Sequence, residues 1–304
     1  MTQNTLAHTT LPGCNRRRLL QLAAGISAMP PTLAPLLARD QQHTGKMQPI
    51  IDCNVSLFHW PFRRLPLDQT PQLLQRFHAL GVNRAIAGSF EAILQRDLSA
   101  VNRRLAAECR TSEVLLPVAA INPAVPGWQQ DLQLCTEELK MSGIRLLPPA
   151  HGYDLQHPHL KELFHTAAAS NLFIQIVVSL EDPRTQPELF RTPEISLLPL
   201  VDLLRDTPLL RVQLLNARNS SSLTSILQQL PAVQTDIARC EGTDGVPRLV
   251  QQLPERQVVF GSHAPFLIPE AALIRTHESS LLSRDQIQQV LHTNAAAFLQ
   301  EVRP

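Results

Sequence analysis

The chain carries the stretch IIDCNVSLFHWPFRRL at residues 50–65. It opens with apolar residues, passes through the polar positions Asp52, Asn54 and Ser56, and then breaks at a proline. An apolar run that ends in polar residues and a proline is typical of a buried strand whose C-terminal end opens into a loop. We therefore predict a strand from Ile50 that presents polar side chains at its end.

A second stretch of the same build, VVFGSHAPF, lies near the other end of the chain at Val258–Phe266. Its apolar residues lead to a polar tip at Ser262 and His263, which a proline again follows closely. We interpret the two stretches as the first and last strands of one closed barrel. The functional residues are then expected where their polar tips meet.

Short apolar runs alternate with amphipathic segments throughout the chain between these two stretches. The predicted strands are Ile50–Ser56, Arg84–Ser89, Val114–Ile121, Gly143–Leu147, Leu172–Val178, Leu209–Leu215, Val233–Ile237 and Val258–Ser262. The predicted helices are Thr70–Leu80, Leu98–Cys109, Trp128–Leu139, His159–Ser170, Ile195–Arg205, Ser222–Leu230, Val246–Leu253 and Arg284–Leu299.

Eight strand–helix pairs over roughly 250 residues match the size and order of a (β/α)8 TIM barrel. We therefore predict an α/β fold with one barrel domain over residues 47–304. A doubly wound open sheet is the alternative, but the glycine-rich phosphate fingerprint typical of that fold is absent from the sequence.

The bulk composition excludes several classes of partner. Of 304 residues, 44% are hydrophobic and 17% are charged, with a net charge of +1, so the chain has no excess charge for nucleic acid or an anionic membrane surface. Aromatic residues make up 4%, which argues against a base-stacking surface. We expect a small-molecule substrate as the partner, no membrane insertion after signal removal, and leave a homo-oligomer open.

Residues 1–46 have the pattern of an export leader. The paired arginines Arg16 and Arg17 precede the moderately apolar segment Leu19–Met29, which resembles a twin-arginine signal. The sequence therefore predicts a periplasmic protein whose leader is disordered or cleaved. A basic leader on a cytoplasmic protein is the alternative.

The active site of a TIM barrel lies at the C-terminal ends of its strands. Polar residues lie in or just after the C-terminal part of each predicted strand, and these are the candidate active-site residues. They are Asp52, Asn54, Ser56, Ser89, Glu91, Asn122, Arg145, His151, Gln175, Asn216, Arg218, Asp236, Glu241, Ser262 and His263.

Several stretches of the chain resemble the amidohydrolase-related family. Ile51–Ser56 stands in place of the family's strand-one Asp-x-His-x-His, and Phe260–Pro265 resembles its Phe-Gly-Ser-Asp-x-Pro. Pro158–Ile174 resembles the passage from helix four to strand five, and Asn294–Leu299 the closing Asn-Ala-x-x-Leu helix. The resemblance covers residues 50–300. It implies a TIM-barrel enzyme that hydrolyses or decarboxylates a small organic substrate, with a divalent metal such as zinc.

The chain departs from the family at the metal ligands. Asn54 and Ser56 stand where the family has its strand-one histidines, Val177 falls near the strand-five histidine, and His263 replaces the strand-eight aspartate. An amide and a hydroxyl are poor ligands for zinc. The resemblance therefore leaves zinc as a possible cofactor, while the residues themselves predict no metal ligand.

Three interpretations remain open. The first is a metal-free site with His263 as general acid or base, Asp236 or Glu241 orienting it, and Gln175 or Asn216 holding an oxyanion. The second is a relocated metal held by His263 with His59, His151 or a carboxylate. The third is a catalytically inactive ligand-binding barrel, a pseudoenzyme.

From these arguments we select two sets of residues. The predicted catalytic residues are His263, Asp236, Asn54, Gln175 and Asn216. The predicted substrate-binding residues are Asp52, Arg63, Glu91, Arg145 and Glu241.

Overall fold

The structure is a computed structural model that describes residues 49–278 and 280–300. The leader predicted over residues 1–46 lies outside the described residues. No helix within the described ranges has the length and apolar character needed to cross a membrane.

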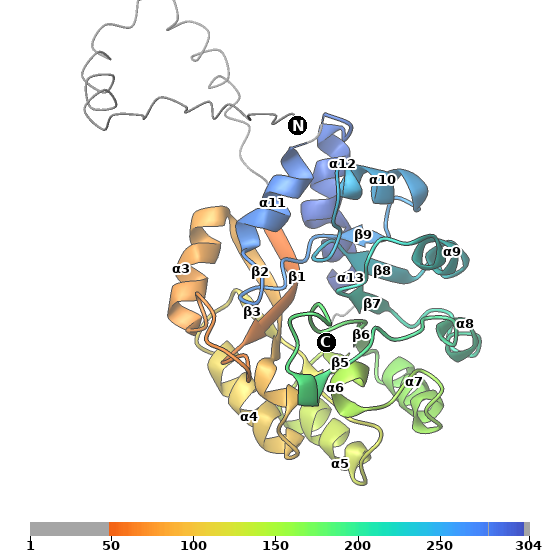
Figure 1. The fold of residues 1–304 in the computed structure, drawn as a ribbon. Coiled ribbons are helices and arrows are strands. Elements are labelled where there is room, and N and C mark those ends of the chain that lie inside the picture. The colour runs from red at the N-terminus through yellow and green to blue at the C-terminus, as the bar shows by residue number, and fades with distance from the viewer. Residues whose placement is uncertain (1–48, 279, 301–304) are drawn as a thin grey trace, which may run out of the picture. The chain divides into compact units, whose positions relative to one another are not determined.

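The described chain forms a ring of parallel strands surrounded by helices (Figure 1). The strands are β1 (Ile50–Leu57), β2 (Val82–Ser89), β3 (Leu115–Pro117), β4 (Ala119–Ala120), β5 (Gly143–Leu146), β6 (Phe173–Val177), β7 (Val212–Leu215), β8 (Val233–Asp236) and β9 (Val258–Val259). They pair in two series, β1-β2-β3 and β4-β5-β6-β7-β8-β9.

Backbone hydrogen bonds join these two series at both ends. Strands β3 and β4 form one position of the barrel, because Val118 between them donates its N–H to the Ala87 carbonyl of β2 at 3.0 Å. On the other side, Cys53 of β1 donates to the Phe260 carbonyl at 2.9 Å, and Ser56 donates to the Ala264 carbonyl at 3.0 Å. The strands therefore close into an eight-position barrel, which confirms the predicted fold.

The helices lie on the outside of the barrel (Figure 1). They are α3 (Thr70–Leu80), α4 (Leu98–Cys109), α5 (Trp128–Gln133), α6 (Pro148–His151), α7 (His159–Ala169), α8 (Leu200–Leu203), α9 (Ser221–Gln229), α10 (Gly245–Gln252), α11 (Pro269–His277), α12 (Arg284–Gln288) and α13 (Asn294–Gln300). π-Helical turns at Leu134–Glu138 and Gln289–Thr293 extend α5 and join α12 to α13.

Helix α3 shows how the sequence sets these boundaries. A proline occupies the first turn, where its missing N–H costs no hydrogen bond. Leu73 and Phe77, one helical turn apart, are buried against the barrel. The helix ends at Gly81, whose φ of 77° is a left-handed conformation that glycine adopts without a steric cost. The predicted bounds of α3 are confirmed.

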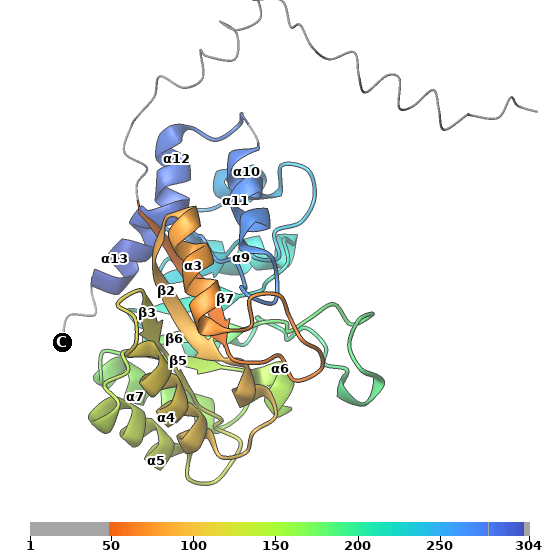
Figure 2. The same cartoon turned by 90° about the vertical axis from the view of Figure 1, so that its left-hand side faces the viewer.

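The helix predicted over Ile195–Arg205 is wrong in extent. Only α8, Leu200–Leu203, is helical there, and Pro199 directly precedes it. Proline lacks an N–H and disfavours helical backbone in the residue before it, so the helix cannot extend upstream of Pro199. The long segment between β6 and α8 instead extends from one end of the barrel, while α13 lies at the opposite end (Figure 2).

Candidate active site

Four predicted site residues meet at the C-terminal ends of the barrel strands. Asn54 is part of β1 and Asp236 ends β8, whereas Asn216 and His263 follow β7 and β9. All four are buried, with no more than 4% of any of them exposed. We call Asn54, Asn216, Asp236 and His263 the polar cluster.

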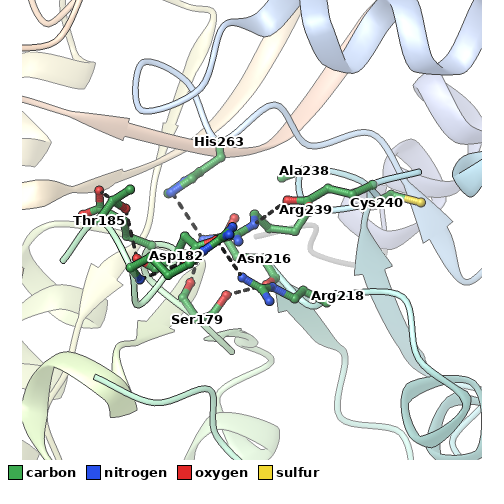
Figure 3. Close-up of polar contacts among 12 residues, drawn as sticks. Ser179, Asp182, Thr185, Asn216, Arg218, Ala238, Arg239, Cys240 and His263 are labelled. Atoms are coloured by element: carbon green, nitrogen blue, oxygen red, sulfur yellow. Dashed lines mark hydrogen bonds and ion pairs between the residues drawn. The ribbon is translucent and has the colours of Figure 1, made fainter. Parts of the chain in front are cut away.

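Hydrogen bonds link the four side chains into one chain. Asn54 Nδ2 donates to Asp236 Oδ2 at 2.6 Å and to Asn216 Oδ1 at 2.8 Å. Asn216 Nδ2 donates to the Ser179 carbonyl at 3.1 Å and lies 3.5 Å from His263 Nε2 (Figure 3). These partners fix which way each amide faces, so that the Asn216 NH2 group faces the imidazole.

The backbone at the polar cluster adopts conformations that residues other than glycine rarely adopt. Asn216 has a φ of 60° and His263 a φ of 56°, both in the left-handed region. Such backbone costs about 1–3 kcal/mol for a residue other than glycine and is common at functional sites.

At Gly261 an added Cβ would lie 2.7 Å from the Asp236 Cβ and 3.0 Å from the Asn54 Cβ. The cluster can therefore form only beside a glycine at this position.

Burial shifts the pKa values of the two titratable members in opposite directions. It raises the pKa of Asp236 to about 7, while hydrogen bonds from the Asn54 side chain and from backbone N–H groups act to lower it. It lowers the pKa of His263 to about 3, and the charges of Arg145 and Arg239 lower it further. The imidazole is therefore neutral at pH 7, and Asp236 titrates near neutrality.

Asp52 joins β1 to the segment after β9 and makes no side-chain hydrogen bond to the side chains of the polar cluster among the described residues. It accepts hydrogen bonds from the Ser262 N–H at 3.0 Å, from the Ser262 hydroxyl, and from the Asn54 N–H at 3.0 Å. Burial raises the pKa of Asp52 to about 6, against the lowering effect of Ser262. This predicted substrate-binding residue therefore holds the polar tips of the first and last strands together.

Arg145 and Gln175 lie in a polar layer inside the barrel. Arg145, Gln175, Gln213 and Gln234 are register neighbours on β5, β6, β7 and β8, and hydrogen bonds of 2.7–2.9 Å connect each to the next. The guanidinium also donates to the Val55 and Ile86 carbonyls and to the hydroxyl of Ser56. All five of its N–H groups are thereby used.

The hydrogen bonds of the polar layer therefore explain why Arg145 and Gln175, two of the predicted site residues, are polar and buried, and no substrate contact is needed to explain it. Burial lowers the pKa of Arg145 to about 10, and the negative charges of Asp236 and Asp52 act to raise it. The guanidinium remains charged at neutral pH and makes no ion pair with either carboxylate among its hydrogen bonds. Arg145 and Gln175 connect the strands that carry the polar cluster.

A pocket of about 680 Å³ opens beside the polar cluster. It is lined by segments that follow β1, β6, β8 and β9. The lining residues are Arg63, Glu181, Asp182, Thr185, Ala238, Arg239, Glu241, Phe266, Leu267, Ile268, Ala271, Ile274 and Arg275. Phe266 connects the pocket to the cluster, because its ring centroid is 4.8 Å from that of His263.

Of the remaining predicted residues, two line this pocket and one does not. Arg63 Nη1 donates to Glu181 Oε1 at 2.7 Å. Glu241 is 67% exposed at the pocket rim. Glu91 instead accepts a hydrogen bond from Arg104 Nε at 2.9 Å and is absent from the lining.

Two pocket residues, Glu181 and Arg239, are missing from the predicted set. Glu181 is the third residue after the predicted strand Leu172–Val178, so its place at a strand end is a signal that could have revealed it. Arg239 lies in the charge-dense segment between Asp236 and Glu241. The sequence shows this density of charge, but only the structure shows that Arg239 is buried.

The chain is similar to solved barrel structures, although no family model and no curated protein sequence matches it. The 2,6-dihydroxybenzoate decarboxylase from Rhizobium has a TM-score of 0.66 at 13% identity, over 84% of this chain and 99% of the other. An amidohydrolase II structure has a TM-score of 0.63 at 13% identity, over 83% and 99%. The chain has the TIM-barrel fold that these structures share. A 5-carboxyvanillate decarboxylase from Novosphingobium aromaticivorans, solved with bound manganese, also shares it, with a TM-score of 0.65 at 12% identity over 84% and 98%.

The divalent metal implied by the resemblance to the amidohydrolase-related family does not fit the residues present. At the strand ends, Asn54 offers N–H donors, and both Asp236 oxygens already accept N–H groups, from Asn54 and from the backbone of Asn216 and Ala238. Cationic metals need free lone pairs from histidine, cysteine or carboxylate. No group of three or more such side chains able to hold a metal exists within residues 49–278 and 280–300.

Proposed function

We propose that the protein is a hydrolase or carboxy-lyase that acts on a small organic substrate without a metal ion at the strand ends. One observation carries the proposal: the hydrogen-bonded chain from Asp236 through Asn54 and Asn216 ends at His263, whose ring packs against the pocket residue Phe266. A reactive group oriented by a second and third residue beside a pocket is the arrangement expected of an active site.

In this proposal each member of the polar cluster has a separate role. Asp236 fixes the Asn54 amide, Asn54 fixes the Asn216 amide, and Asn216 orients the imidazole. His263, neutral at pH 7 because burial lowers its pKa, exchanges a hydrogen bond or a proton with the substrate. Because His263 is only 4% exposed, side chains that cover it, Phe266 and Phe90 among them, would have to move before a substrate could contact it.

A second candidate function is ligand binding without catalysis. The same burial of His263 favours it, as does the use of both Asn54 Nδ2 hydrogens within the cluster. Under this alternative the polar cluster only stabilises the barrel mouth, and the pocket holds a ligand that is not transformed.

Turnover and binding assays on the same panel separate the two functions. The panel contains aryl esters, anilides and aromatic carboxylic acids, assayed with and without a chelator. We expect chelator-insensitive turnover of one class, lost in His263→Ala and retained in the exposed control Arg103→Met. Binding without turnover by the wild-type protein would favour the second candidate. Turnover unchanged in a folded His263→Ala variant would contradict the site assignment.

A further inference from the structure

Within the pocket of the proposed function, we infer that the ligand is a small organic anion that carries a neutral hydrogen-bond donor on an apolar body. Two buried groups, Arg239 and Glu181, have hydrogen-bonding capacity that the described residues leave unused, and they define the two polar ends of this ligand. The apolar wall formed by Phe266 and its neighbours defines the body.

Arg239 is the cation available to an anionic group. Its side chain is 6% exposed and lines the pocket, yet within the described part of the chain its one ion pair is a 3.5 Å contact from Nε to Glu241 Oε1. Because Glu241 is 67% exposed, solvent weakens that pair. A buried guanidinium needs partners for its N–H groups, and a carboxylate fits it with two parallel hydrogen bonds. An anionic ligand would supply what Arg239 lacks.

The other arginines of the pocket are already engaged. Arg275 donates to the carbonyls of Ala238, Cys240 and Ala271, which anchors α11 to the segment after β8. Arg63 is paired with Glu181 at 2.7 Å. The ligand's anionic group is therefore assigned to Arg239 and not to the pocket's cations in general.

Glu181 provides the acceptor for the ligand's donor. Its side chain is 3% exposed, and Oε1 accepts hydrogen bonds from Arg63 at 2.7 Å and Thr185 at 2.8 Å. Oε2 is buried without a hydrogen-bond partner among the described residues. A buried oxygen in this state is unfavourable, and a hydrogen bond from a ligand donor would remove that cost. Because Arg63 already balances the charge of Glu181, a neutral donor such as a hydroxyl or an amide N–H is favoured over an ammonium.

The rest of the lining is mostly apolar. Phe266, Leu267, Ile268 and Ile274 face the pocket, and its volume of about 680 Å³ lies within the range of small-molecule sites. Ile268 is 64% exposed and Ile274 59%, so a bound apolar body would cover surface that water now contacts. A one-ring aromatic acid with a hydroxyl or amide substituent matches these features.

Titration calorimetry with three matched probes tests the inference without any need for turnover. The probes are 4-hydroxyphenylacetate, phenylacetate, which lacks the donor, and 2-(4-hydroxyphenyl)ethanol, which lacks the anionic group. We expect the first to bind at least roughly tenfold more tightly than either of the others, the effect of about 1.4 kcal/mol for each lost interaction.

Two variants and one control assign the contacts. Arg239→Met should remove the preference for the two acids, and Glu181→Gln should remove the preference for the hydroxyl, since an amide NH2 then replaces Oε2. The exposed Arg103→Met should change neither preference. Equal affinities for the acid and the alcohol, no binding of any probe, or an unchanged Arg239→Met would overturn the inference. Absence of turnover with these preferences intact would count against the proposed enzyme only.

Discussion

Gly88 of β2 lies so close to Arg145 that a Cβ at residue 88 would be 2.5 Å from the Arg145 Nη1 atom. The guanidinium cannot simply move aside, because all five of its N–H groups are hydrogen-bonded within the buried polar layer. The glycine therefore provides the space through which Arg145 reaches across from β5 to β1 and β2.

We expect Gly88→Ala to lower the free energy of unfolding by about 1–3 kcal/mol, because overpacking displaces Arg145 from buried acceptors. Urea unfolding measures the change. Gly245→Ala is the matched control, since the nearest atoms to a Cβ there lie at 3.4 Å, an ordinary contact distance. An equal unfolding midpoint for wild type and Gly88→Ala would show that the polar layer adapts freely.

The pH dependence of stability should report on Asp236. Burial raises its pKa from 3.8 to about 7, so between these pH values the folded chain holds a proton that the unfolded chain releases. The Asp236 contribution to the free energy of unfolding therefore falls as the pH rises through this window.

Comparison with Asp236→Asn isolates this effect, because the asparagine does not titrate. Whatever the stability of the variant at pH 5, wild type should lose stability relative to it when both are unfolded in urea at pH 8. A difference between the two proteins that stays constant from pH 5 to pH 8 would show that Asp236 keeps the same protonation state on folding.

The donor set of the polar cluster predicts that the protein purifies without stoichiometric zinc, manganese or iron. We also expect its thermal midpoint to be unchanged by a chelator, since no ligand set would be emptied. Elemental analysis of protein purified without chelator checks this, with His263→Ala beside it. One equivalent of metal that the variant loses would restore the interpretation of a relocated metal site.

The export prediction concerns residues outside the described structure. Replacing Arg16 and Arg17 together by lysine should retain the chain in the cytoplasmic fraction of a bacterial host, whereas wild type reaches the periplasm. Arg18→Lys is the matched control, because it lies next to the pair. Wild-type protein in the cytoplasmic fraction would favour the alternative of a basic leader without export.

Much of the fold could be predicted because the apolar runs and helix-ending residues act locally. The bounds predicted for α3 and α4 are those of the structure, and each predicted strand overlaps an observed one. The helix over Ile195–Arg205 was placed on its apolar pattern, which does not register the backbone restriction at Pro199. Helices α6 and α11 were not predicted.

The site could be predicted only in part. Asn54, Asn216, Asp236 and His263 were identifiable because parallel strand ends meet at one face of a barrel. The sequence could not show that Gln175 accepts a hydrogen bond from Arg145 within the barrel. A polar residue on a strand gives the same sequence pattern whether its partner is a substrate or a neighbouring side chain. The unused capacity of Arg239 and Glu181 likewise depends on burial and on distances between segments far apart in the sequence.

The two hydrogen bonds donated by Asn54 Nδ2 restrict which residues can replace this asparagine during evolution. A neutral histidine at position 54, the form that binds a metal, offers one N–H in place of that NH2 group, so either Asn216 Oδ1 or Asp236 Oδ2 would lose its donor. A single change to a metal-binding histidine at residue 54 would thus leave a buried acceptor without its donor before any metal could bind. Such a change would need a second one at Asn216 or Asp236, so epistasis restricts the evolution of a metal site at this barrel mouth by single substitutions.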